Sequence, residues 1–182
     1  MSLEYLSVEP APRPRWHWIV GSAVAIVLVT ALGALWWSGH VRERANIQLE
    51  ASLVRANSDA HGGEAVVLSV LQYSSPTIWS TMVGEDVRAS LRGLVQRSAA
   101  QVVRTLDDTK ASVDGTFVLP WDSGQREAKD AVRALVDAHR ARFEQIAADA
   151  TAIGAVFSSP APSDTTARAL LRASGAITDD GD

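Results

Sequence analysis

The pattern of hydrophobic positions divides the chain into one uninterrupted apolar segment and a longer region of amphipathic segments. The apolar segment reads WIVGSAVAIVLVTALGALWW over residues 18–37 and contains no charged side chain. A helix of about 20 residues rises roughly 30 Å, which matches the hydrocarbon thickness of a bilayer. Tryptophan favours the membrane–water interface, and it lies at both ends of the segment as Trp16, Trp18, Trp36 and Trp37. We therefore predict a transmembrane helix over residues 16–38, anchored at its interfaces by these indole rings.

A cleaved signal peptide is the alternative explanation of this segment. Small residues at cleavage-like spacing occur between Ala31 and Gly33, as they do before a signal-peptidase site. The apolar run is long, however, and it ends in the bulky pair Trp36–Trp37 rather than in small residues. We therefore expect an uncleaved signal-anchor.

The orientation of this helix is predicted from its short N-terminal side. Arginines flank both ends, so the positive-inside count is nearly balanced. A tail of residues 1–15 before a long C-terminal region is typical of a signal-anchor with its tail in the cytoplasm. We expect a single-pass cell-membrane protein with an extracytoplasmic C-terminal domain. Gly21 and Ala25 match the small-xxx-small spacing of paired membrane helices, although ordinary alanine and glycine content is the preferred explanation.

Helical spacing continues beyond the membrane segment. Apolar positions in residues 39–61 recur at helical intervals and predict a juxtamembrane stalk. The dipeptide Gly62–Gly63 is expected to end it. Residues 64–72 then form a nearly all-apolar short helix, which needs burial on more than one face. Its candidate packing or partner-facing residues are Val66, Val70 and Leu71.

The remainder of the domain, residues 62–157, is predicted to contain a long helical hairpin. One helix is expected over residues 77–110, with Gly84 as a point of interruption. An ordered loop over residues 113–121 follows, with Phe117, Leu119 and Trp121 expected to pack against the helices. Asp122 and Gln125 have the spacing of an N-terminal capping pair.

The helix expected over residues 123–157 carries a heptad seam. Its buried positions advance in alternating steps of three and four residues, and the candidate packing or partner-facing residues among them are Val132, Val136, His139, Phe143, Ile146 and Ile153. Such a seam must pack against another helix. We favour the preceding helix, folded back antiparallel, over an intermolecular coiled coil. Residues 158–182 are predicted to form a linker, a short helix near residues 164–174 and an acidic tail.

Composition supports an all-α fold and narrows the function. The 182 residues are 47% hydrophobic and rich in alanine and arginine, which are good helix formers. The scarcity of lysine points to GC-rich bacterial coding. A net charge of −4 argues against nucleic acid as a partner. Cysteine is absent, which excludes disulfides and thiolate metal sites.

The sequence offers no recognisable catalytic, cofactor or metal site. The four histidines lack metal-ligand spacing. Adjacent acidic residues such as Asp107 and Asp108 point about 100° apart on a helix, so they do not form a facing acid–base pair. His139 lies on the heptad seam, where a histidine bonded to a neighbour is expected and a pH sensor is the alternative. Tyr73, Trp79 and Trp121 are expected to pack the ends of the hairpin, with a small pocket as the alternative.

Taken together, these patterns predict one transmembrane helix followed by a small helical bundle built on a long antiparallel hairpin. We expect a non-catalytic, membrane-anchored interaction or scaffold subunit of a bacterial membrane or cell-envelope complex. Its partners would be the lipid bilayer and another membrane or envelope protein, with no cofactor. The alternative is an extracytoplasmic domain that senses or binds a small ligand.

Overall fold

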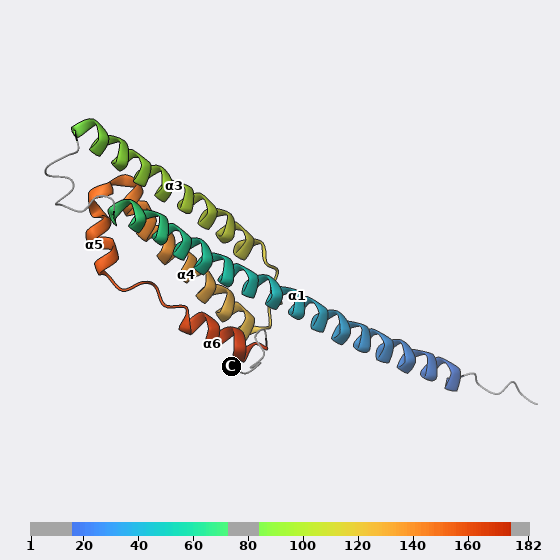
Figure 1. The fold of residues 1–182 in the computed structure, drawn as a ribbon. Coiled ribbons are helices and arrows are strands. Elements are labelled where there is room, and N and C mark those ends of the chain that lie inside the picture. The colour runs from blue at the N-terminus through green and yellow to red at the C-terminus, as the bar shows by residue number, and fades with distance from the viewer. Residues whose placement is uncertain (1–15, 73–83, 176–182) are drawn as a thin grey trace, which may run out of the picture. The chain divides into compact units, whose positions relative to one another are not determined.

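All elements of the fold are helices, as the composition predicts (Figure 1). The computed structural model describes residues 16–72 and 84–175. Its elements are α1 (Trp16–Gln72), α3 (Glu85–Gly115), α4 (Ser123–Ala148), the 3-10 turn η1 (Ala150–Ala152), α5 (Ile153–Ser158) and α6 (Thr165–Ala173). No strand occurs among the described residues. The N-terminal tail, Tyr73, Trp79 and the acidic C-terminal end lie outside them.

The chain forms two compact units, residues 1–39 and residues 40–182. Helix α1 contributes residues 16–39 to the first unit and residues 40–72 to the second. Among the described residues, α1 is the one helix long and apolar enough to cross a membrane. None of the most apolar window of α1 is buried by other parts of the protein. A membrane-spanning length of helix near the N-terminus is therefore present.

Helix α1 continues through Gly62 and Gly63, so the predicted break at these glycines is wrong. A Cβ atom on Gly63 would lie 2.6 Å from Cγ2 of Val102 and 3.0 Å from Cζ of Phe143. Gly63 thus lets α1 approach α3 and α4 closely. This packing outweighs the low helix propensity of glycine, about 1 kcal/mol per residue. The expected short helix over residues 64–72 is consequently the last part of α1.

The core of the second unit consists of two hydrophobic clusters. Residues 39–61 were predicted to form a stalk, but Leu49, Leu53, Ala56 and Ala60 of this stretch are buried in the two clusters. Ala56 and Ala60 pack in the larger cluster around Phe143. Leu49 and Leu53 pack in the smaller one, with residues from α4 and α6. Residues 40–72 of α1 are therefore an integral helix of the bundle.

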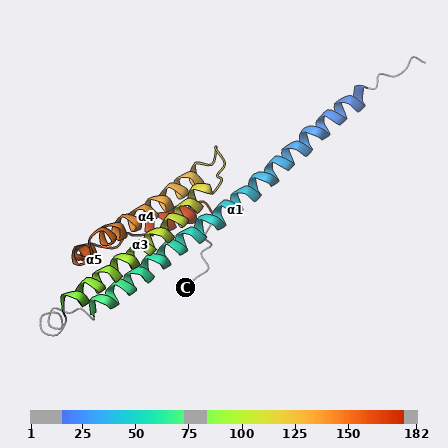
Figure 2. The same ribbon diagram turned by 90° about the horizontal axis from the view of Figure 1, so that it is seen from above.

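Helices α3 and α4 pack against each other along the bundle, and α4 returns antiparallel to α3 (Figures 1 and 2). The loop between them is pinned by Leu119, which is 3% exposed. Phe117 and Trp121 are 59% and 71% exposed, so the expectation that they also pack against the helices is wrong. A turn closed by the hydrogen bond from the Asp122 N–H to the Leu119 carbonyl separates the buried Leu119 from the exposed Trp121.

Helix α4 begins as predicted, because the Asp122 carboxylate accepts a 3.1 Å hydrogen bond from the Gln125 N–H. It ends earlier than predicted, at Ala148. The Asp149 side chain accepts hydrogen bonds from the Thr151 N–H and hydroxyl, which start a new helical turn and compete with the continuing helix. The seam nevertheless continues into α5, where Ile153 is buried.

Candidate functional site

The second unit contains a polar cavity of about 220 Å³. It lies between α1, α4 and the segment that precedes α6. Its walls carry two imidazoles, two carboxylates and a carboxamide, and they consist of Asn57, Ala60, His61, Glu64, His139, Ala161, Pro162, Ser163 and Asp164. We call it the His139 cavity, because His139 is its most buried polar side chain.

His139 is only 3% exposed. Neither of its ring nitrogens has a hydrogen-bond partner among the described residues, so the expectation that it bonds to a neighbour is wrong. Burial lowers the pKa of His139, the positive fields of His61 and Arg142 lower it further, and Asp164 opposes them. A neutral imidazole has one donor and one acceptor nitrogen, and leaving them unpaired is unfavourable. The cavity therefore offers an unsatisfied donor and acceptor to a small polar molecule or to water.

The carboxylates of the cavity wall are already paired. Glu64 forms a 2.9 Å ion pair with Arg142. Asp164 accepts a 2.8 Å hydrogen bond from Asn57 and is paired with Arg168. Burial alone would raise the pKa of Asp164, but the hydrogen bonds from Arg168 and Asn57 and the charge of Arg168 outweigh it and lower the pKa. The acidic groups are therefore occupied, and His139 is the buried wall residue whose two ring nitrogens have no partner among the described residues.

Arg142 holds the chain segment that forms the outer wall of the cavity. Its guanidinium donates to the carbonyls of Val156, at 3.1 Å, and Ser159, at 3.2 Å. It also lies 5.3 Å from the centre of the Phe157 ring, in range of a cation–π interaction. One side chain thus ties α4 to α1, through Glu64, and to the segment after α5.

A second polar cluster joins α1 to the start of α4. The Arg42 guanidinium contacts the Asp122 carboxylate at 2.7 Å, and the side chain of Gln125 donates to the Arg42 carbonyl at 2.8 Å. The same Gln125 amide donates to Asn46 at 2.7 Å, and Asn46 donates to the Ser174 carbonyl at 3.2 Å. These groups bind one another, so the cluster fixes three helices in place.

The predicted packing residues fall into two groups in the structure. The seam residues are buried inside the bundle, namely Val132, Val136, His139, Phe143, Ile146 and Ile153. In α1, Val66 is 49% exposed and Val70 is partly buried. The side chain of Leu71 lies outside the described part of the chain. The seam therefore holds the bundle together. Among the predicted packing residues whose side chains are described, Val66 is the exposed one.

The opposite face of α1 is a surface that was not predicted from the sequence. Seven exposed residues recur in alternating steps of four and three, and we call them the outer face of α1: Ile47, Ala51, Val54, Ser58, His61, Ala65 and Leu68. A shallow groove on this face is lined by α1 residues alone. The alternating spacing is present in the sequence. It was not recognised because the buried residues of the same helix have the more regular apolar pattern.

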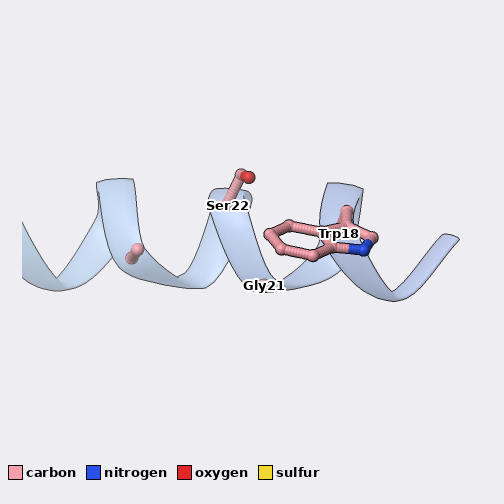
Figure 3. A pocket seen from close by; sticks show the side chains of 4 residues that line it. Trp18, Gly21 and Ser22 are labelled. Atoms are coloured by element: carbon pink, nitrogen blue, oxygen red, sulfur yellow. The ribbon is translucent and has the colours of Figure 1, made fainter. Parts of the chain in front are cut away.

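The first unit carries a shallow hollow on the apolar helix. Trp18, Gly21, Ser22 and Ala25 line it, and the Trp18 ring lies beside the small residues (Figure 3). Gly21 has open space where a Cβ would be. The four tryptophans proposed as interface anchors include Trp18, at 79% exposed, and Trp36, at 74%. Trp16 and Trp37 are also exposed.

No group of three or more His, Cys, Asp or Glu side chains in the described residues is arranged to hold a metal ion. Comparisons of the chain with protein-family models, with curated proteins and with solved structures found no match. The geometry of the chain itself therefore supplies the argument for its function.

Proposed function

We propose that the protein is a bitopic, membrane-anchored helical interaction subunit without catalytic activity. The first unit would be the anchor, and the bundle would present a helical surface to another membrane or envelope protein. A signal-anchor orientation, with the bundle outside the cytoplasm of a bacterial cell, completes the proposal.

The observation that carries this proposal is the exposure of the apolar part of α1, of which no other part of the protein buries the most apolar window. Its side chains include Val29, at 70% exposed, and Leu35, at 69%. Exposed apolar surface is unfavourable in water by roughly 25 cal/mol per Å², whereas lipid removes that penalty. The tryptophans at both ends add the aromatic belt that interfaces favour. The outer face of α1 then provides a surface for protein contact beyond the membrane.

Membrane fractionation and a topology reporter test this proposal together. The full chain should stay in the membrane pellet after alkaline carbonate extraction and dissolve in detergent. Replacing Val24 and Leu28 by Arg should release it, because a charge at the centre of a bilayer helix is disfavoured by about 3 kcal/mol. A periplasm-active reporter fused after Asp182 should be active. Full recovery of the unaltered chain in the soluble fraction would refute the anchor.

The His139 cavity favours one second candidate, which is the binding of a small polar ligand. Its support is the buried imidazole with unused donor and acceptor capacity beside a space of about 220 Å³. Native mass spectrometry of the detergent-purified protein tests it. A bound small molecule should be present in the unaltered protein and absent from a His139→Phe variant, which replaces the imidazole donor and acceptor by an apolar ring of similar size. An identical mass for both proteins after subtraction of the substitution refutes this candidate.

A further inference from the structure

The outer face of α1 lies directly opposite the face that α1 buries in the bundle. Successive residues of a helix are rotated by about 100°. Leu49, Ala56 and Ala60, each no more than 2% exposed, therefore point away from Ile47, Ala51 and Val54. The outer face extends from residue 47 to residue 68 and is roughly 30 Å long by helical rise. Within the part of the chain that the structure describes, no other helix covers it.

The residues of the outer face have the spacing and size pattern of a coiled-coil seam. In heptad terms, Ala51, Ser58 and Ala65 occupy the a positions, where small side chains permit close approach. The d positions carry the larger side chains, with Ile47 and Val54 60% and 55% exposed. His61 and Leu68 occupy the remaining d positions. This seam is separate from the buried seam of α4.

The charges beside the seam are complementary to a second copy in parallel register. Glu50 occupies a g position and Arg55 the e position five residues later. In a parallel pair, the g residue of one helix faces this e residue of the other. Glu50 has no ion pair among the described residues, and Arg55 contacts Asp59 at a long 3.8 Å. A pair of chains would therefore form two symmetric Glu50–Arg55 ion pairs, one on each side of the seam.

The geometry points to a second copy of this chain as the occupant of the outer face, forming a parallel two-stranded coiled coil over residues 47–68. This inference rests on the proposed membrane anchor, because two copies inserted in the same direction would carry residues 47–68 on the same side of one membrane. Confinement to the membrane also raises the effective concentration of the partner. Alanine and serine at the a positions bury little apolar surface, so this seam depends on the raised effective concentration to form a dimer.

Disulfide trapping in native membranes tests the inference, since the chain contains no cysteine. Single variants Ala51→Cys and Val54→Cys place thiols on the seam, and Ala134→Cys places one at an exposed position of α4 as the matched control. With a copper–phenanthroline oxidant, we expect covalent dimers from the seam variants at several-fold higher yield than from the control. Seam positions of a parallel pair meet the Cα separation that a disulfide requires, below about 7 Å.

Charge exchange gives an independent readout in the Ala51→Cys background. Glu50→Arg should lower the dimer yield several-fold by placing like charges across the seam, and adding Arg55→Glu should restore it. Equal yields from Ala51→Cys and Ala134→Cys, or no recovery in the exchanged variant, would overturn the inference. Crosslinks from position 51 to a different protein alone would exclude the second copy and leave the proposed interaction function standing. Release of the chain by carbonate would instead refute the anchor itself.

Discussion

Gly62 and Gly63 are adjacent in one helix, yet replacement by alanine should change stability in opposite directions. Gly62 has open space where a Cβ would be. Gly62→Ala should therefore stabilise the bundle by about 0.5–1 kcal/mol, the helix-propensity difference between glycine and alanine. Gly63→Ala gains the same term but places a Cβ 2.6 Å from Val102 Cγ2. That separation is roughly 1 Å below an ordinary carbon–carbon contact.

The neighbours of Gly63 have little freedom to move away. Val102 is β-branched and strongly prefers one rotamer in a helix. The Phe143 ring is 1% exposed and would lie 3.0 Å from the new Cβ. Overpacking of this kind reduces stability by about 1–3 kcal/mol, which exceeds the propensity gain. The free energy of unfolding of Gly63→Ala should thus lie about 1–3 kcal/mol below that of Gly62→Ala.

Urea titration of the full chain in detergent, followed by far-ultraviolet circular dichroism, measures both variants. The linear dependence of the unfolding free energy on urea gives the comparison. Adding Val102→Ala to Gly63→Ala should recover part of the loss, because it removes the closest overlapping atom. Equal stabilisation by Gly62→Ala and Gly63→Ala would refute the close approach of α1 to α3 and α4.

Three further predictions concern the cap, the cavity and the core, each read by the same urea titration. In an Arg42→Gln background, which lacks the ion pair to Asp122, Asp122→Ala should lower the free energy of unfolding by about 0.5–2 kcal/mol through loss of the helix cap. Asp122→Asn should lower it by less in the same background, and equal losses would contradict the capping role. Because burial lowers the pKa of His139, the imidazole of the unfolded chain takes up a proton at a higher pH than the imidazole of the folded chain. The contribution of His139 to the free energy of unfolding is therefore fully present above pH 6.5, and it is lost as pH falls from 6.5 toward the folded pKa. The free energy of unfolding should fall by at most about 1.4 kcal/mol per pH unit in this range. This dependence on pH should flatten in His139→Gln but not in His40→Gln. Ile146→Ala should lose about 2–5 kcal/mol and Val66→Ala under about 0.5 kcal/mol; similar losses would show that Val66 is a core residue.

Hydrophobic spacing predicted most of the helical architecture, because burial follows directly from it. The seam of α4 can be read from the spacing within one helix and the cap at Asp122 from a contact three residues away, and both were predicted. The path of α1 through Gly63 was not, because it depends on Val102 and Phe143, which are distant in sequence. Local propensity favoured a break, and tertiary packing overrode it.

The candidate site was harder to predict than the fold. His139 could be assigned to a buried seam from its spacing alone. The cavity beside it depends on where the segment over residues 161–164 lies, and that segment has no periodic pattern. The outer face of α1 has a readable period, but Ser58 and His61 interrupt its apolar character. Such a mixed stripe can be recognised as a surface only when the exposure of its side chains is known.

The role of Arg142 has a consequence for the dynamics of the bundle. The segment between α5 and α6 is not helical over residues 159–164, and polar contacts hold it, among them those from Arg142 and Asn57. Local opening there needs the loss of a few polar contacts, whereas opening of α4 needs the loss of the hydrophobic core. Amide hydrogens near residues 161–164 should therefore exchange with solvent much faster than those of α4. Such breathing would admit small molecules to His139 while the helices stay folded.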